Sequence, residues 1–236
     1  MGQPRRRAEI HHEHRDVSGG WLRPTVFGAM DGLVSNFALV AGVAGGTSDT
    51  KVIVLTGLAG LAAGAFSMAG GEYVSVASQR ELALAEIAVE KRELERNPEQ
   101  EELELAEFYE TRGVSPEIAA EVARQISRHP QRALQAHVRA ELGVDPDKLP
   151  SPKLAALSSF LSFGVGALLP VLPYLFGATV LWISAGVSLV ALFGAGALVS
   201  LVTARSWWYS GVRQLVVGGA AAGLTYALGS AIGAGA

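Results

Sequence analysis

The sequence contains no cysteine, so a disulfide-stabilised scaffold and a cysteine-based zinc site are excluded. It is also poor in charge: 17% of the residues are charged, against about 25% in soluble proteins. This shortage excludes an ordinary soluble domain and an intrinsically disordered chain. The formal net charge of −3 leaves no surplus of basic residues, and duplex nucleic acid is therefore not an expected partner.

Long apolar runs are what the chain has instead. Residues 52–71, 154–204 and 214–236 contain no Asp, Glu, Lys or Arg, and a membrane-spanning helix needs about 20 mostly apolar residues. The longest run exceeds one span and is interrupted by Pro170, Pro173 and Gly177, so it predicts two helices. The sequence therefore predicts an all-α, polytopic membrane protein. Its five expected transmembrane helices cover residues 22–46, 52–71, 153–173, 178–203 and 211–234.

The distribution of positive charge predicts the orientation of these helices. Of the 19 Lys and Arg residues, 18 lie in the amino tail, in segment 72–153 or between the last two expected spans. The positive-inside rule places these segments in the cytoplasm. We therefore expect a cytoplasmic amino terminus and, with an odd number of spans, an outside C-terminus. No cleaved signal peptide is expected, because about 20 polar residues precede a first apolar segment that is too long for one.

The charged residues divide the chain into sections. An insertion between the second and third spans is punctuated by Asn-Pro, Ser-Pro and His-Pro pairs and by two glycines, which are typical helix starts and ends. We expect it to form a small helical domain. The amino tail carries His11-His12-Glu13-His14, which is either a metal-binding stretch or a plain polar tail. The predicted sections are a polar cytoplasmic tail at 1–21, spans 1–2 at 22–73, the cytoplasmic domain at 74–151 and spans 3–5 at 152–236.

Acidic residues are concentrated in the first part of the insertion, where residues 81–110 hold 11 Glu. Glu86, Glu90 and Glu93 share one helix face, because they are spaced by four and three residues, and Glu101 and Glu104 share a face of the next helix. Like charges at this spacing destabilise a helix by about 0.2–0.5 kcal/mol per pair. Two interpretations remain open: a solvated acidic surface, or an oxygen-rich site for divalent cations.

Two residues near the end of the insertion fit the second interpretation. His137 and Glu141 are four residues apart and would complete a cation site. The insertion contains no Glu-x-x-His sequence, so a ferritin-like di-iron oxidase centre is not supported.

Asp31 is the one acidic residue inside an expected span. A carboxylate at mid-membrane costs about 2.5–3.5 kcal/mol and usually faces a bundle interior or a water-filled path; the alternative is a helix cap or a packing hydrogen bond. Met68 alone is typical of core filler. Opposite Asp31, however, a thioether favours a transition-metal ion over Mg²⁺ or Ca²⁺. Glu72, one turn later, would pass ions toward the insertion or simply lie at the membrane interface.

Several glycines are four residues apart within the expected spans, as in Gly28/Gly32 and Gly42/Gly46. Such pairs permit close helix packing, either within one chain or between two copies. The sequence contains no phosphate loop, nucleophile elbow or other catalytic constellation, and we expect no enzymatic activity.

Two motifs resemble a known family. Residues 26–35, Val-Phe-Gly-Ala-Met-Asp-Gly-Leu-Val-Ser, resemble the first-helix signature of the vacuolar iron transporter family. Residues 62–73, Ala-Ala-Gly-Ala-Phe-Ser-Met-Ala-Gly-Gly-Glu-Tyr, are similar to its second-helix signature. The Glu-rich insertion, Glu141-Leu142-Gly143 and the Pro-containing turn at 170–174 follow in family order. The resemblance implies a homodimer with five spans per subunit, and an interfacial path that exchanges cytosolic Fe²⁺, and often Mn²⁺, for protons.

The resemblance also implies roles for individual residues. It places Asp31 and Met68 on the ion path of the membrane. It places the ligands of a cytoplasmic metal-binding domain at Glu90, Glu93, Glu101, Glu104 and Glu141.

The chain departs from the family pattern at a few positions. Plant members have further acidic residues where this chain has Gly20, Pro24 and Gly60. His137-Val138 replaces a Met-Met pair, which brings an imidazole in place of a soft ligand. Glu72 stands where some relatives have glycine.

The expected function is proton-coupled export of Fe²⁺, and of Mn²⁺ or similar ions. The metal is the substrate, no prosthetic group is expected, and Asp31 and Glu72 are the candidate proton carriers. Two alternatives stay open: a membrane-anchored metal sensor or store, and a metal-gated channel without proton coupling. A prokaryotic plasma membrane is the expected location, with a vacuolar membrane as the alternative.

Overall fold

The computed structural model describes residues 21–203 and 205–235. The amino-terminal segment 1–20, which holds the expected tail and its His11-His12-Glu13-His14 sequence, lies outside the described residues. The described part is helical throughout and contains no strand, which confirms the all-α class. Its elements are α1 (Leu22–Gly46), α2 (Thr50–Arg96), α3 (Pro98–Glu110), α4 (Pro116–Ser127), α5 (Pro130–His137), η1 (Val138–Leu142), η2 (Pro146–Lys148), α6 (Pro152–Leu168), α7 (Leu172–Leu175), α8 (Leu181–Thr203) and α9 (Trp207–Gly233).

Four of these helices, α1, α2, α8 and α9, are long and apolar enough to cross a membrane. Helix α2 runs without interruption for 47 residues, well beyond the apolar run that predicted it. The apolar helix α6 is shorter than expected and ends at Leu168 instead of 173. The cause is Pro170, which has no N–H to offer the carbonyl of Gly166, so the helix cannot continue in register.

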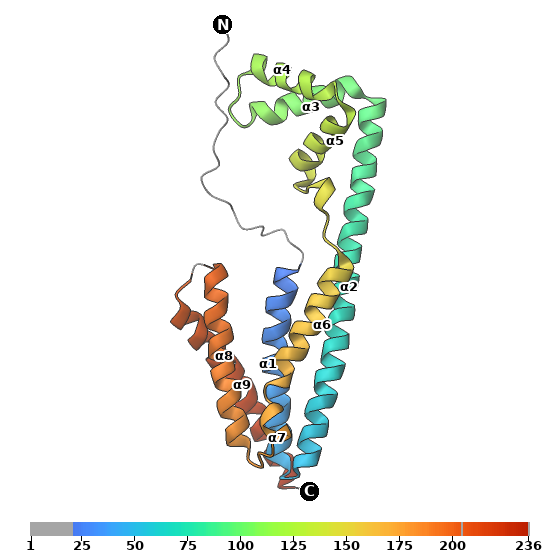
Figure 1. Ribbon diagram of the computed structural model, residues 1–236. Coiled ribbons are helices and arrows are strands. Elements are labelled where there is room, and N and C mark those ends of the chain that lie inside the picture. Colours follow the sequence, from blue (N-terminus) through green and yellow to red (C-terminus); the bar gives the residue numbers. More distant parts are fainter. Residues whose placement is uncertain (1–20, 204, 236) are drawn as a thin grey trace.

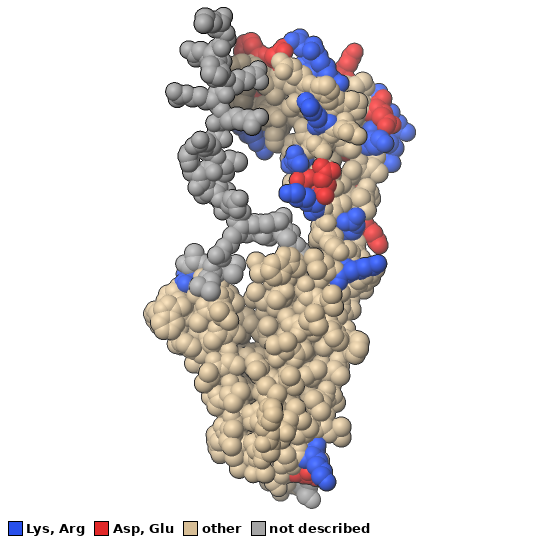
Figure 2. Space-filling view, viewed as in Figure 1, with Lys and Arg blue, Asp and Glu red and all other residues tan. Residues whose placement is uncertain are grey.

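Figure 1 shows how the helices are arranged. Helices α1, α2 and α6 pack together, and α8 and α9 form a pair beside α1. The second half of α2 projects out of this bundle and carries α3, α4 and α5 at its far end. In Figure 2 the charged side chains gather on that projecting part, whereas the visible face of the bundle is almost uncharged down to its opposite tip.

Glycine allows the closest approach inside the bundle. A Cβ at Gly32 of α1 would meet the backbone of Phe163 in α6, and one at Gly166 of α6 would meet the backbone of Ala29. Gly42 of α1 lies in the same way against Thr225 of α9. These glycines therefore serve packing within one chain, as the spacing of the pairs allowed.

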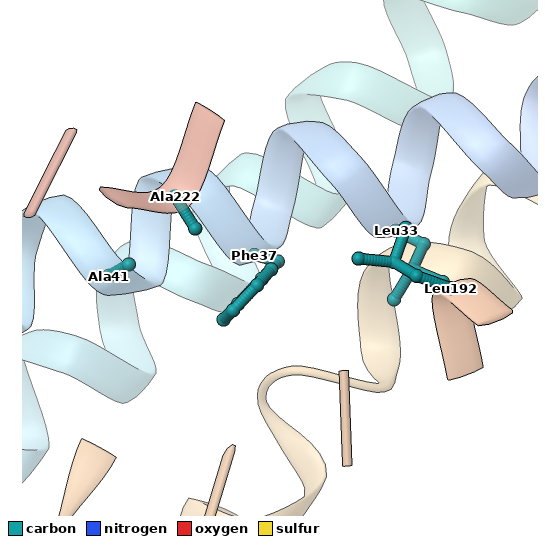
Figure 3. Close-up of a cluster of buried hydrophobic side chains, with 5 residues drawn as sticks. All are labelled: Leu33, Phe37, Ala41, Leu192 and Ala222. Carbon is teal, nitrogen blue, oxygen red and sulfur yellow. The ribbon is translucent and has the colours of Figure 1, made fainter. Parts of the chain in front are cut away.

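Figure 3 shows the apolar core where α1 meets the α8–α9 pair. It contains Leu33, Phe37 and Ala41 of α1, Leu192 of α8 and Ala222 of α9. This cluster holds three segments that are far apart in the sequence.

The projecting part has a small core of its own, built by α3 and α4. Its buried members are Leu105, Ala106, Ala119 and Ala123. Pro98, Pro116 and Pro130 each occupy the start of a helix, as the Asn-Pro, Ser-Pro and His-Pro pairs predicted. After α5 the chain continues directly as the π-helical turn η1, and this helical stretch ends before Gly143, which has a φ of 66°.

Candidate metal centre

Four side chains meet where α2, α3 and the end of α5 come together. They are Glu90 of α2, Glu101 of α3, His137 of α5 and Glu141 of η1. One ligand atom from each lies within 4.8 Å of all the others. In an octahedral site with metal–ligand distances of about 2.1 Å, opposite ligands are about 4.2 Å apart. The four atoms therefore have nearly the spacing that a single divalent ion requires.

The π-helical turn positions the last of these ligands. Glu141 lies within η1, and its Oε1 is 3.1 Å from His137 Nδ1. Short π-helical segments are rare and are frequent at functional sites. The side chain of Glu141 is 44% exposed, whereas that of His137 is 1% exposed. The centre is thus buried on the side of the imidazole and open on the side of Glu141.

The cluster has more hydrogen-bond acceptors than donors. His137 Nδ1 also lies 3.2 Å from Glu90 Oε1 and 3.5 Å from Glu101 Oε2. A single ring nitrogen carries at most one hydrogen, so it cannot satisfy three carboxylates. Within the described part of the chain, Glu90 Oε1 and Glu101 Oε2 are buried without a hydrogen-bond partner. A bound cation would satisfy these oxygens together.

Burial and mutual repulsion also favour protonation of the carboxylates. Burial raises the pKa of Glu90 to about 7, and the nearby charges of Glu141 and Glu101 add to the rise. Burial raises the pKa of Glu101 as well, with Glu104 adding to it. Near neutral pH the cluster therefore holds a proton that a metal ion would displace.

The other two predicted carboxylates of the insertion lie beside this cluster. Glu104 borders a cavity of about 280 Å³ that His137 and Glu141 also line. Glu93 is turned toward the junction of α2 and α3, where it accepts a hydrogen bond of 2.9 Å from Asn97 Nδ2. The helix-face pattern thus located the cluster but did not distinguish its buried members from its neighbours.

Asp31 and Met68 have different surroundings within one chain. Asp31 is exposed on α1, whereas Met68 is half-buried on α2 and packs against Ala65, Phe163 and Ala167.

The packing of α1 on α2 gives the relative depth of the membrane residues. Asn36 of α1 bonds to Gly57 of α2, and Val40 packs beside Ile53, so the two helices run antiparallel with these pairs at the same level. Asp31 is then level with about residue 62. At about 1.5 Å per residue, Met68 lies about 9 Å nearer to the α3–α5 end, and Glu72, half-buried, lies one turn further on.

Asn36 is a buried residue that the sequence analysis missed. It is 2% exposed and its amide contacts both α2 and α6. A polar side chain within an apolar run was the available signal.

Comparison with known proteins gives a consistent result. The VIT family model matches residues 22–230. Vacuolar iron transporter 1 of Oryza sativa subsp. japonica is 33% identical over 231 residues, which cover 94% of this chain and 90% of the relative. The vacuolar iron transporter of Acanthamoeba castellanii is 39% identical over 227 residues, covering 92% of this chain and 81% of the relative. Vacuolar iron transporter 2 of the same rice is 30% identical over 228 residues, covering 94% and 92%.

Proposed function

The chain belongs to the VIT family, and we propose that it exports Fe²⁺ from the cytosol in exchange for protons. At the level of the family it is a multi-pass membrane protein that transports metal ions and is not an enzyme. The expectation drawn from the two helix signatures is confirmed to this extent. The coupling to protons, the dimeric path and the transport of Mn²⁺ are parts of the proposal.

The cluster of Glu90, Glu101, His137 and Glu141 carries the proposal. Carboxylate oxygens suit Mn²⁺ and an imidazole suits Fe²⁺, so a mixed set of this kind fits first-row divalent ions such as these two. The buried, unpartnered oxygens of Glu90 and Glu101 support a cation at this place. We assign the domain at 74–151 to the cytoplasm, where it would capture the ion, with Glu93 and Glu104 as peripheral ligands or attracting charges.

The proposed topology has five spans. Helix α6 is 17 residues long, which corresponds to about 26 Å. That length falls short of the hydrocarbon thickness of about 30 Å, so α6 and α7 together would form the third span. The amino terminus would then be cytoplasmic and the C-terminus outside, in a prokaryotic plasma membrane.

The proposed path leads past Glu72 and Met68 to Asp31, which follow one another at successive depths. Asp31 is exposed on the single chain. Because a carboxylate facing lipid is costly, a second copy of the chain is expected to cover this face and enclose the path. Protons returning through Asp31 and Glu72 would drive export.

The test is Fe²⁺ uptake into proteoliposomes with and without an opposing pH gradient. We expect uptake to require the gradient and to fall at least about tenfold in Asp31→Asn and in Met68→Ala, because each variant lacks one side chain that would bind the ion on the path. Glu86→Gln, an exposed carboxylate on the same long helix as Met68, is the matched control and should transport normally.

Other outcomes would favour the alternatives. Metal binding without flux would indicate a sensor or store, and flux that ignores the pH gradient would indicate a channel. Normal flux in both path variants would remove the assigned path.

A further inference from the structure

Asn36 joins three helices of the bundle through one side chain. Its Nδ2 donates to the carbonyl of Gly57 in α2 at 3.1 Å and to the carbonyl of Ala167 in α6. Both partners are acceptors, so the NH₂ group and not the Oδ1 atom must face them. The two bonds connect α1 to segments that lie 21 and 131 residues away in the sequence.

The carbonyl of Ala167 needs this donor because α6 ends just beyond it. In a continuing helix the N–H of Val171 would bond to Ala167, but here it bonds to the carbonyl of Leu168 at 3.0 Å. An open carbonyl within the hydrocarbon region must find a donor inside the protein. Ser184 of α8 acts in the same way at this break and donates to the carbonyl of Pro170 at 2.6 Å.

The surroundings of Asn36 fit one relative position of α1 and α2. A Cβ at Gly60 would lie 2.8 Å from Asn36 Oδ1, so the amide is accommodated because α2 carries no side chain there. Oδ1 itself is buried and has no hydrogen-bond partner within the described residues. The side chain is thus held by its two N–H bonds alone, and a shift of either helix would break one of them.

We propose that Asn36 is a positioning residue for the ion path. Asp31 lies five residues earlier on α1, which places it about 7.5 Å away along the axis and on another face. By tying α1 to α2 and to the open end of α6, Asn36 sets the depth of Asp31 relative to Met68. The inference rests on the proposed function, in which an ion passes both residues.

Transport kinetics of matched variants test this role. Asn36→Leu removes both donors. We expect the KM for Fe²⁺ of the folded variant to rise about tenfold, because Asp31 and Met68 no longer keep their relative depth. Thr225→Val is the control: it removes a comparable bond of 2.6 Å between Thr225 Oγ1 and the carbonyl of Ala38, which joins α1 to α9. We expect Thr225→Val to leave the KM unchanged.

Ser184→Ala tests whether an open carbonyl at the end of α6 is enough to change the KM, or whether α1 must also move. It removes the other donor at the break without touching α1, and the KM should stay as in the unaltered protein. Asn36→Gln keeps both donors on a longer side chain and should show a smaller rise in KM than Asn36→Leu. If Asn36→Leu does not fold, a KM for Asn36→Gln equal to that of the unaltered protein would overturn the inference.

A distance measurement makes the test independent of transport. Because the chain lacks cysteine, a variant that carries both Phe27→Cys on α1 and Phe66→Cys on α2 takes one spin label at each of these two exposed positions. Labelled protein is diluted with unlabelled copies so that only distances within one chain are recorded. Asn36→Leu, or Asn36→Gln in its place, should shift or broaden the distance, and Thr225→Val should not.

The two readouts distinguish the two proposals. An unaltered KM together with an unaltered distance in Asn36→Leu overturns the positioning role. If the unaltered protein does not transport Fe²⁺, the proposed function fails, while the label distances still decide whether Asn36 holds α1 against α2.

Discussion

At the scale of single residues, the decisive feature is one buried imidazole surrounded by three carboxylates. His137 Nδ1 lies within 3.5 Å of an oxygen from Glu90, Glu101 and Glu141. No arrangement of one hydrogen satisfies three acceptors, so a metal ion that binds at the proposed centre would compete with protons for the same oxygens. Because burial raises the pKa of Glu90 to about 7, a lower pH favours the proton over the metal ion.

The raised pKa of Glu90 leads to a prediction for the pH dependence of metal affinity. Below pH 7 Glu90 is mostly protonated and metal binding must release its proton, so affinity should rise as the pH is raised from 6 to 8. The rise is at most about tenfold per pH unit for each proton released. Titration calorimetry of the purified protein with Mn²⁺, which resists oxidation, measures it.

Two variants control this experiment. Glu90→Gln removes both a ligand and the titrating group, so it should weaken Mn²⁺ binding and flatten the pH dependence around 7. Glu86→Gln, one turn earlier and exposed, should change neither. Unchanged affinity in Glu90→Gln would contradict the assignment of the cluster as the metal centre.

At the scale of elements, the bundle depends on how closely α1 approaches α6. Gly32 faces the backbone of Phe163, with no room for a Cβ, whereas Gly164 on α6 has open space around it. The same substitution should therefore have opposite effects at the two positions.

We predict that Gly32→Ala destabilises the protein by about 1–3 kcal/mol, because the added methyl group forces the helices apart. Gly164→Ala should be neutral or stabilise by up to about 1 kcal/mol, since alanine is the better helix former. Unfolding of both variants in detergent solution measures the difference. Equal stability of the two would show that α1 and α6 are not packed as described.

The elements also show the limits of sequence-based prediction. Helix starts and ends follow from local chemistry, and Pro98, Pro116, Pro130 and Gly143 were located correctly for that reason. The early end of α6 was not predicted. Proline was recognised as a break in the apolar run, but the sequence did not show that Val171 N–H bonds to Leu168 at the break and leaves the carbonyl of Ala167 open.

At the scale of the whole molecule, a charged helical extension is joined to an apolar bundle through one continuous helix, α2 (Figures 1 and 2). In the sequence, 18 of the 19 Lys and Arg residues lie in the amino tail, in segment 72–153 or at Arg205 and Arg213. The proposed orientation places this whole side in the cytoplasm.

Cysteine accessibility provides a test of that orientation. In this cysteine-free chain, Thr179→Cys between α7 and α8 should react with an impermeant maleimide added outside the cell. Ser206→Cys between α8 and α9 should react only after the membrane is opened, because it lies at the opposite end of α8. The reverse pattern would invert the proposed topology, and outside labelling of both would change the number of spans.

The sequence by itself determined the features that depend on neighbours along the chain. Length and lack of charge specify apolar helices, and the Glu spacing identifies the segment that carries the proposed metal centre. The tertiary structure alone decided which carboxylates are buried together. Helical spacing indicates that Glu90 and Glu93 share a face, but only the meeting of α2, α3 and α5 brings Glu90 against His137 and Glu101, while Glu93 bonds locally to Asn97. The role of Asn36 is likewise tertiary, because its partner Ala167 is 131 residues away and is open only where α6 ends.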